Sequence, residues 1–470
     1  TIDIKNLLES VTFPYIEKVL QKKVQEEILD NEIKSAKIMV EKRSNSFWSL
    51  AKPENGLKWN LLGSIAELLY QLVNIKMELK SFEFTGTRLV KAYCDNSGWY
   101  IIDSLHRKVE KQYFEYSKWI QDEENLLEQI VSHTRNEYFV VVSELINRFL
   151  NIIEKEGLNI KGIESQSKIF FRFVKPFIGK EKIAYFLVDA LRYEMGTELI
   201  NGIDIKEASI YYAIACIPTI TEFGMAALLP KANENIQLIE AKNNKLEIQI
   251  DKIPLRNRKN RVSFLQNIYE DSCVVLKLEN ILKMTKSTRK KIDGKELVVI
   301  TSQEIDELGA IDNISLARKI MSDILGEIKH GIRNLNNLGF TRFVITSDHG
   351  YIFYEDIKDD LKINSPGGQR LDLHRRYWIG KGGADSENTV RIKASVLGWT
   401  GDFDFIFPKG LAFFKVIGSS QGYFHGGISL QEVIIPIIDL KFEEKVVKRK
   451  SPAIFKINIG RKVITTRFFT

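Results

Sequence analysis

The chain has 470 residues, with 68 lysines and arginines against 61 acidic residues and a formal net charge of +7 at pH 7. This length exceeds one typical hydrophobic core, so we expect two or three domains, and 44% hydrophobic residues are ordinary for a soluble globular protein. The slight positive excess is compatible with a polyanionic partner but does not establish nucleic-acid binding.

The sequence also argues against a membrane protein and against a disulfide-stabilised one. No apolar run approaches the roughly 18 residues of a membrane span, and the first residues show no signal-peptide pattern. The three cysteines, Cys94, Cys216 and Cys273, are an odd number without a CxxC pair. Neither a disulfide framework nor a thiolate zinc site is expected, and a reducing cytoplasm is the default location.

Residues 1–165 are predicted to form an N-terminal helical domain. Apolar residues recur at helical spacing after the breaker segment Pro53–Gly56, namely Leu61, Leu62, Ile65, Leu68, Leu69 and Leu72. A second helical pattern covers residues 114–154. We interpret this region as a helical bundle that supports the domain that follows.

Residues 166–440 are assigned to an α/β domain. The runs Ile183–Val188, Leu297–Ile300 and Phe343–Ile345 are continuously apolar, which is typical of buried strands. Between the last two runs lies an amphipathic helix that Gly339 ends, with its apolar stripe at Leu316, Ile320, Ile324 and Ile328. Strand, helix and strand in this order predict a βαβ unit with parallel strands.

Three further segments are interpreted from composition. The polar, lysine-rich stretch 231–295 is predicted to be a cap or insertion over the sheet, and its basic segments 254–262 and 285–291 are interpreted as solvated loops, with a phosphate-backbone contact as the alternative. Residues 363–372 are predicted to be an exposed loop. Residues 441–470 begin with a charged link and then alternate like strands, which predicts the start of a β-rich segment.

Asp189 follows the apolar strand that ends at Val188. Open α/β sheets place ligand-binding groups just beyond the carboxyl ends of their strands, and a carboxylate there is a good ligand for a divalent cation. Aspartate is also favoured as the N-cap of a following helix. For this residue alone the capping interpretation is favoured.

A Pro-Thr-Ile-Thr turn, 218–221, leads into an apolar segment that predicts a helix. A hydroxyl at a helix N-terminus meets free backbone N–H groups, so a phosphate would fit there. A threonine alkoxide next to a metal could attack that phosphate. A capping threonine is the alternative, and by itself it would be favoured about two to one.

Ser347-Asp348-His349-Gly350 follows the third strand and is the strongest single signal. Asp348 and His349 offer one oxygen and one nitrogen ligand on a short turn, and Gly350 lets the backbone bend tightly. The alternative is a surface turn. We favour the metal site, because buried acidic and imidazole groups need a partner.

Three weaker features complete the set. His425-Gly426-Gly427 offers a second imidazole ligand, with a core histidine as the alternative. Asp306, after the second strand, is a further candidate carboxylate. In His374-Arg375-Arg376 the two arginines could bind phosphate oxygens bidentately, or they could form a solvated basic edge.

The order Asp, Thr, Asp, Asp-His, His resembles the alkaline phosphatase superfamily. The local sequence motifs are similar to those of the PglZ domain of bacterial and archaeal phage-defence (BREX) systems, in the type A phosphatase members. The matching stretches are LVDALRYEM at 187–195, IPTITEFGMAALLP at 217–230, ITSDHGYIF at 345–353, HRRYWIG at 374–380, YFHGGISLQEVIIP at 423–436 and, in the helical part, GWYIIDSLHRKVE at 98–110. The resemblance implies an alkaline-phosphatase-like central sheet flanked by helices.

The resemblance also implies roles for individual residues. Asp189, Thr221, Asp348 and His349 would hold one divalent metal, with Thr221 as the nucleophile because it is the later of the two hydroxyl positions. Asp306 and His425 would hold a second metal. Zinc is the first candidate, with manganese and magnesium as alternatives. His374, Arg375 and Arg376 are the candidate phosphate-binding residues.

The second metal site departs from the family pattern. Residues 298–310 contain no histidine: Ala310 stands where the superfamily places one four residues after the aspartate, and Ser302 stands where related PglZ proteins carry one.

Two hypotheses about function follow. The protein is a metal-dependent phosphoesterase of a BREX system, or it is a catalytically weak metal-binding scaffold. A nuclease that acts on DNA is a third hypothesis. The implied partners are other BREX proteins and DNA, with no membrane.

Overall fold

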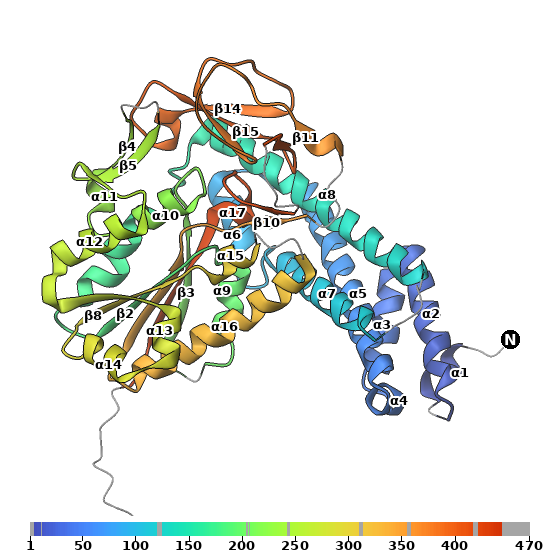
Figure 1. Cartoon of the computed structure of the whole chain (residues 1–470). Helices are drawn as coiled ribbons and strands as arrows, with labels where there is room; N and C mark the ends of the chain where they lie inside the picture. Colours follow the sequence, from blue (N-terminus) through green and yellow to red (C-terminus); the bar gives the residue numbers. More distant parts are fainter. Residues whose placement is uncertain are drawn as a thin grey trace, which may run out of the picture.

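The computed structural model describes residues 4–10, 12–119, 125–203, 205, 207–241, 245–309, 314–354, 359–416 and 422–443. Its first part is an arm of helices, seen at the right of Figure 1, that projects from a larger α/β body. The helices of this arm and of its junction with the body are α1 (Ile4–Glu9), α2 (Tyr15–Leu29), α3 (Ile33–Arg43), α4 (Phe47–Ala51), α5 (Pro53–Leu79), α6 (Gly86–Cys94), α7 (Ile101–Ser117) and α8 (Asn125–Glu156). In Figure 1, α6 is seen within the outline of the body. The two helical patterns predicted within residues 61–72 and 114–154 both fall in this arm.

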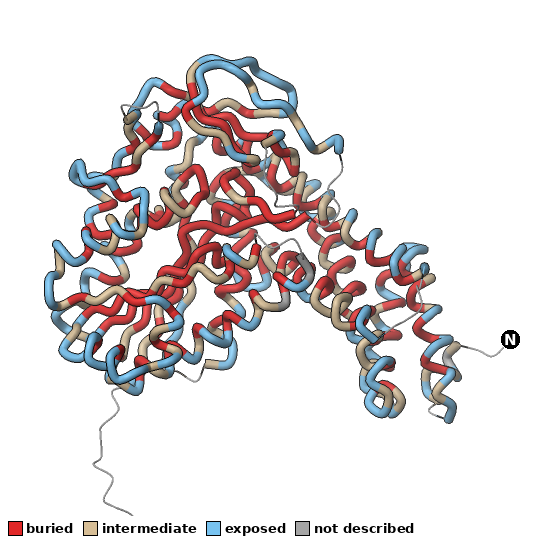
Figure 2. The backbone as a smooth tube through the Cα atoms, viewed as in Figure 1, coloured by how far each residue is buried: buried red, intermediate tan, exposed pale blue. Residues whose placement is uncertain are grey.

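The body is built on a seven-stranded mixed sheet, which Figure 2 shows as the most continuously buried part of the molecule. Its order is β1 (Glu164–Ser165), β3 (Glu207–Ile214), β18 (Ile434–Lys441), β9 (Arg342–Ser347), β2 (Ile183–Val188), β8 (Leu297–Ser302) and β7 (Cys273–Lys277). The last four strands are mutually parallel, whereas β18 is antiparallel to both of its neighbours.

The three predicted strands correspond to β2, β8 and β9. The predicted amphipathic helix is α16 (Ile314–Asn336), and β8 and β9 are parallel as expected. They are not neighbours, because β2 lies between them and pairs with both. α16, α13 (Leu278–Lys283) and α9 (Tyr193–Ile200) share one apolar cluster with one face of the sheet, so the sheet is covered by helices on that side.

The predicted insertion at 231–295 is only partly a cap. A small sheet of β4 (Ile236–Glu240), β5 (Leu246–Ile250) and β6 (Ile253–Pro254) and the helix α12 (Arg258–Tyr269) do lie outside the central sheet. After them, β7 pairs with β8 as the edge strand of the central sheet. The stretch therefore ends inside the core architecture, with α13 and α14 (Lys286–Ile292) leading to β8.

A second sheet, at the top of Figure 1, was not predicted. Its order is β12 (Gln369–His374), β13 (Tyr377–Lys381), β15 (Asp404–Pro408) and β14 (Thr389–Lys393), all antiparallel. The predicted loop at 363–372 is correct only in part, because β12 begins at Gln369. Two short pairs, β10 (Ile352–Phe353) with β17 (Tyr423–Phe424) and β11 (Lys362–Ile363) with β16 (Phe413–Phe414), complete the strands.

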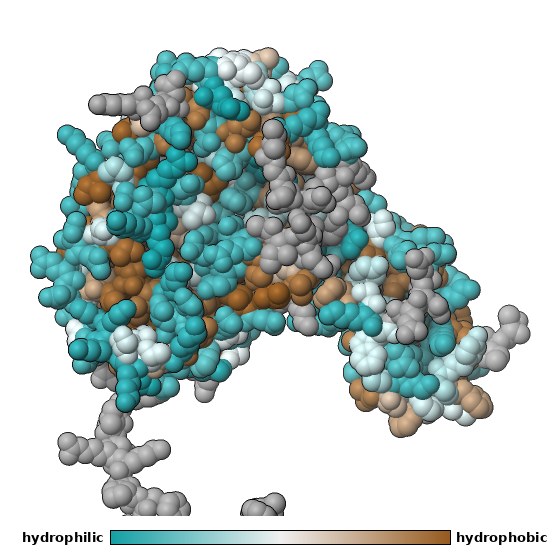
Figure 3. Space-filling model, viewed as in Figure 1, coloured by the Kyte–Doolittle hydropathy of each residue, from teal (hydrophilic) through white to brown (hydrophobic). Residues whose placement is uncertain are grey.

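The ends of the predicted domains can be placed in part. The arm's last helix ends at Glu156, and Glu164–Ser165 already pairs with β3 of the central sheet. Most of the predicted β-rich segment at 441–470 lies outside the described residues. Among the described helices, none is long and apolar enough to cross a membrane, and apolar residues on the face in Figure 3 form separate patches among hydrophilic ones.

Buried charges join the arm to the body. Arg192, which follows β2, lies between two carboxylates: its Nη2 is 2.9 Å from Asp103 of α7, and its Nε is 3.0 Å from Glu194 of α9. All three side chains are buried. Gln431, shortly before β18, also donates to Asp103 at 3.2 Å. The arm therefore contacts the segment that begins at Asp189.

Candidate metal centre

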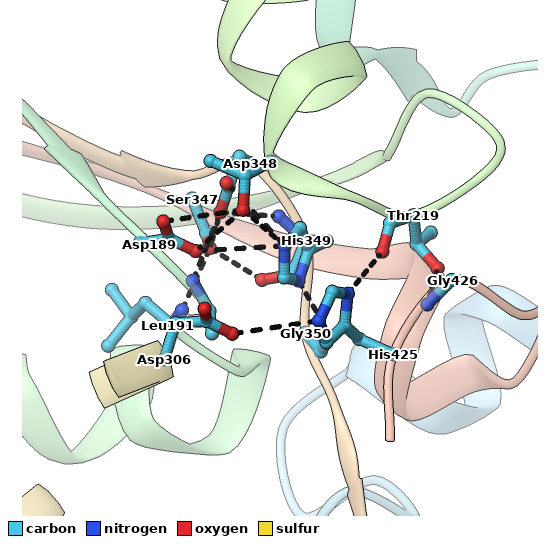
Figure 4. Close-up of polar contacts among 12 residues, drawn as sticks. Asp189, Leu191, Thr219, Asp306, Ser347, Asp348, His349, Gly350, His425 and Gly426 are labelled. Carbon is cyan, nitrogen blue, oxygen red and sulfur yellow. Dashed lines mark hydrogen bonds and ion pairs between the residues drawn. The ribbon is translucent and has the colours of Figure 1, made fainter. Parts of the chain in front are cut away.

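The candidate ligands gather where three adjacent parallel strands end. Asp189 follows β2, and Asp348 and His349 follow β9. Asp306 lies in α15 (Glu304–Gly309), the helix after β8. Because β9, β2 and β8 are neighbours in that order, their carboxyl ends meet at one edge of the sheet. Residues separated by more than 150 positions in the sequence thus come together, as Figure 4 shows.

Asp189, Asp348 and His349 form one compact group. Each offers a ligand atom, and these atoms all lie within 4.8 Å of one another. His349 Nε2 is 3.6 Å from Asp189 Oδ1 and 3.6 Å from Asp348 Oδ2. All three side chains are buried, which is costly for two carboxylates unless a cation neutralises them. Two carboxylates and an imidazole are a donor set that suits a divalent metal.

The Asp348 carboxylate is held so that one oxygen stays available. Its Oδ1 accepts the backbone N–H groups of Ala190 at 3.0 Å and His349 at 2.9 Å. Its Oδ2 is buried, and no hydrogen-bond donor among the described residues reaches it. An unsatisfied buried carboxylate oxygen that faces another carboxylate and an imidazole is the observation that fits a bound cation best.

Both site histidines are oriented by a backbone carbonyl. His349 Nδ1 lies 3.0 Å from the carbonyl oxygen of Gly350, and His425 Nδ1 lies 3.2 Å from that of Thr219. Because a carbonyl can only accept, each ring donates from Nδ1 and turns its Nε2 towards the site. Burial lowers the pKa of His425, and the neighbouring His349 lowers it further, so this imidazole is neutral at pH 7. Neutral imidazole is the form that binds metals.

The surroundings of Asp189 disfavour the charged form of its carboxyl group. Burial raises its pKa well above the ordinary value, and the charges of Asp348 and Asp306 raise it further. The hydroxyl of Thr221 has the opposite, smaller effect. A cation bound beside these carboxylates would offset both the desolvation and the repulsion.

The two candidate threonines have different hydrogen-bond partners in the structure. Thr221, at the start of α10 (Thr221–Ala227), places its Oγ1 3.4 Å from both Asp189 oxygens and 3.3 Å from His349 Nε2. Thr219 is fully buried, and its hydroxyl donates to the carbonyl of Gly427 and accepts from the N–H of Gly426. Thr219 therefore fixes the 425–427 turn, whereas the hydroxyl of Thr221 lies at the cluster.

Asp306 and His425 form a neighbouring pair. His425 Nε2 is 3.8 Å from Asp306 Oδ1, which also accepts from the Tyr423 hydroxyl at 2.9 Å. The rings of His425 and His349 stack with their centroids 4.5 Å apart, so the pair adjoins the first cluster. Of the two positions where the family pattern has a histidine, Ala310 lies outside the described residues, and Ser302 is buried and hydrogen-bonds Glu304.

The structure does not bring all three candidate phosphate-binding residues to a common site. Arg376 is buried, faces Glu432 at 3.4 Å and donates to the carbonyl oxygens of Gly410 and Ala412. These contacts occupy its guanidinium inside the fold, so it is not placed to bind phosphate. Arg375 is partly exposed and lies over the ring of Phe424. His374 is exposed and stacks on Tyr377.

Two positions beside the cluster require glycine because of close backbone contacts that the sequence did not reveal. Gly350 does not adopt a positive φ; instead, a Cβ there would lie 2.0 Å from the carbonyl oxygen of Gln431. A Cβ on Gly224 of α10 would lie 2.3 Å from the carbonyl oxygen of Asp348. Only glycine lets these segments approach so closely. No local signal marks Gly224, because the contact is with a residue over 100 positions away.

Comparison with known proteins identifies the fold. Residues 169–440, more than half of the chain, match the family model of the BREX system PglZ alkaline phosphatase-like domain. The chain belongs to the PglZ family. The expected architecture, an alkaline-phosphatase-like central sheet flanked by helices and preceded by a helical region, is confirmed.

Two PglZ relatives extend the match into the helical arm. The alkaline phosphatase-like protein PglZ of Bacillus cereus (strain H3081.97) is 26% identical over 390 residues, which cover 79% of this chain and 43% of that protein. The alkaline phosphatase-like protein BrxZ of Escherichia coli O9:H4 (strain HS) is 27% identical over 433 residues, covering 88% of this chain and 48% of that protein. The chain thus spans less than half the length of either relative.

Among solved structures, murine ectonucleotide pyrophosphatase/phosphodiesterase 5 aligns with a TM-score of 0.37 and 12% identity. The alignment covers 55% of this chain and 88% of that one.

Proposed function

We propose that this chain is a metal-dependent phosphoesterase domain of a BREX phage-defence system, with Thr221 as its nucleophile. The observation that carries the proposal is the position of the Thr221 hydroxyl, within 3.4 Å of Asp189 and His349 in the buried three-ligand cluster. Nucleophile and ligands therefore share one site at the ends of β2 and β9. Other BREX proteins are the proposed partners, and the cytoplasm is the proposed location.

Asp189, Asp348 and His349 would hold the first cation, and Asp306 and His425 are the candidates for a second. Zinc is the first choice because an imidazole accompanies the carboxylates, with manganese and magnesium as alternatives. A bound divalent cation would polarise the phosphoryl oxygens and favour ionisation of a nearby hydroxyl.

The reaction needs two displacements at phosphorus. Thr221 Oγ1 forms a bond to phosphorus while the ester bond breaks, and the departing alcohol takes up a proton. Water then attacks the same phosphorus, the bond to Thr221 Oγ1 breaks, and phosphate leaves as the hydroxyl regains its proton. Thr219 holds the 425–427 turn, and with it the His425 ring, in place beside this centre.

The test is the hydrolysis of p-nitrophenyl phosphate and bis(p-nitrophenyl) phosphate by chelator-treated protein, before and after zinc, manganese or magnesium is added. Thr221→Ala should lower kcat by about 10³-fold or more, because the nucleophile is lost. Thr221→Ser keeps a hydroxyl and is the matched control, which should retain much of the activity. Full turnover by Thr221→Ala would exclude this mechanism.

A metal-binding scaffold without turnover is the second candidate function. It is favoured by the composition of the second pair, where the described residues place only Asp306 and His425 together. Metal would then stabilise the fold without catalysis. About one ion per chain, with no hydrolysis of either ester, would support this function. Clear turnover with two ions bound would rule it out.

A further inference from the structure

A small pocket opens directly beside Thr221 and Asp189, under the cap helix α12. Its floor is apolar and comes from the central strands, including Leu187 and Val299, while α12 contributes Arg258 and Arg261. The pocket holds about 30 Å³. Cavities that bind benzene are near 150 Å³, so this pocket has room for a small polar group and not for an aromatic ring.

Arg258 is placed in this pocket without an acidic partner. Its Nη2 donates to the hydroxyl of Thr301 at 3.2 Å, and its Nε is buried without a hydrogen-bond partner among the described residues. Within the described ranges, no carboxylate lies within 4.0 Å of its guanidinium. Arg256, two residues earlier, does pair with Glu222 at 3.5 Å and is largely exposed. The basic segment 254–262, expected to be solvated, therefore divides into an exposed part and an inward part.

Arg261 is anchored by one end only. Its Nη1 donates to the carbonyl oxygens of Leu255 and Arg256, at 3.1 and 2.6 Å. Burial lowers the pKa of Arg261, and the negative charges of Asp348 and Asp189 act in the opposite direction. The charge of Arg261 therefore interacts with the carboxylates of the cluster, although no described carboxylate lies within 4.0 Å of its guanidinium. An arginine keeps its proton at any accessible pH, so the pocket is permanently cationic.

Charge balance alone is an insufficient explanation for the two arginines. If they served only to neutralise the acidic cluster, direct ion pairs with Asp189 or Asp348 would be expected, as Arg192 forms with Asp103 and Glu194. Instead, Arg258 donates to the hydroxyl of Thr301, and Arg261 donates to the carbonyl groups of Leu255 and Arg256. Both guanidinium groups are partly buried, which is costly without an anionic partner, and an anionic ligand would offset that cost.

We propose that Arg258 and Arg261 form an oxyanion subsite that binds the non-bridging oxygens of the phosphoryl group positioned at Thr221. The inference rests on the proposed function for the identity of the ligand. It assigns to the cap helix a direct role in binding substrate, and it makes phosphate esters, and inorganic phosphate as their product, the ligand class. The small volume places the phosphoryl group in the pocket and leaves the alcohol portion outside.

The experiment measures binding of inorganic phosphate to the zinc-loaded chain by calorimetry, together with phosphate inhibition of p-nitrophenyl phosphate hydrolysis. Arg258→Met and Arg261→Met should each weaken phosphate binding by about 10-fold or more, because a charge-assisted hydrogen-bond pair is lost. Zinc content, measured in parallel, should stay at the wild-type level. Lys259→Met, an exposed position on the same helix, removes the same charge and should change phosphate binding by less than about twofold.

Conservative variants separate recognition from folding. Arg258→Lys and Arg261→Lys keep the charge but lose the planar fork, so they should fold and still weaken phosphate binding. Unchanged phosphate binding in both Met variants would overturn the inference. So would an equal loss of zinc and phosphate, because the arginines would then act on the metal cluster. The absence of any phosphate binding by wild-type protein would overturn it as well.

The outcomes for the two proposals can be told apart. Arginine-dependent phosphate binding without turnover would retain the subsite and remove the phosphoesterase. Turnover with KM and phosphate inhibition unchanged in the arginine variants would retain the phosphoesterase and remove the subsite.

Discussion

The Asp189 carboxyl lies in a position that is only 2% exposed, next to Asp348 and Thr221. Burial is the main reason why its pKa is raised, and the neighbouring carboxylates add to the effect. In the metal-free protein, the ionised form of this carboxyl opposes folding. The same charge is what a divalent cation would bind. A site of this kind lowers the stability of the metal-free protein and raises its affinity for a divalent cation.

Asp189→Asn should therefore separate stability from metal binding. Because the folded-state pKa is raised, the stability of the metal-free wild type falls as the pH rises from the unfolded value, near 4, towards the folded one. The amide carries no charge, so the metal-free variant should be as stable as wild type at pH 7 or more stable, by about 1–3 kcal/mol. Its stability should also depend less on pH above 4. Thermal unfolding in chelator at pH 5 and pH 7 measures both effects.

The zinc response is the second half of this prediction. Zinc should raise the melting temperature of wild-type protein and have much less effect on Asp189→Asn, because a ligand is missing. Asp402→Asn is the control, since Asp402 is exposed and belongs to neither candidate metal pair nor the three-ligand group. It should keep most of the zinc response. An undiminished zinc response in Asp189→Asn would exclude this residue as a ligand.

At the scale of single elements, the sequence predicted the strands and helices that have a clear local pattern of apolar residues. β2, β8 and β9 were predictable because strands buried on both faces are continuously apolar. Their ends then indicated Asp189 and the Asp348–His349 turn. β7 was missed because this edge strand is short and lies in a lysine-rich stretch. The sequence did not show that Arg376 is buried, because the order of residues does not reveal which of two adjacent side chains points inwards.

The contact between α10 and the turn after β9 is the element-scale feature that holds Thr221 near Asp348. Gly224→Ala would place a methyl group 2.3 Å from the Asp348 carbonyl oxygen and must push the two segments apart. We expect a loss of about 1–3 kcal/mol in stability and a lower kcat, because Thr221 moves with α10. Thermal unfolding and p-nitrophenyl phosphate kinetics measure the two effects.

Gly326→Ala provides the matched control for this helix substitution. Gly326 lies on α16, and nothing is within 4 Å of the position that its Cβ would take. Alanine should be neutral there or stabilise the helix by about 0.5–1 kcal/mol. If Gly224→Ala matched Gly326→Ala in both stability and kinetics, the close approach would not constrain the site.

At the scale of the whole molecule, the helical arm contacts the segment that carries Asp189 of the candidate metal centre. Asp103 of α7 accepts hydrogen bonds from the hydroxyls of Tyr93 and Tyr138 and faces Arg192, three residues beyond Asp189. The network is buried, so it links the arm to the site in a region that water does not screen. Sequence periodicity could predict the arm but not this link, because its members come from four separate segments.

Asp103→Ala should therefore affect a site that it does not touch. Removing the carboxylate leaves the buried Arg192 without one of its two partners, a change that typically costs about 3–5 kcal/mol. The segment carrying Asp189 should lose its support, so both the melting temperature and the zinc-induced stabilisation should fall. Lys22→Ala breaks an exposed ion pair with Glu26 elsewhere in the arm and should leave both quantities unchanged. If Asp103→Ala lowered the melting temperature but left the zinc response intact, the arm would stabilise the fold without positioning the metal ligands.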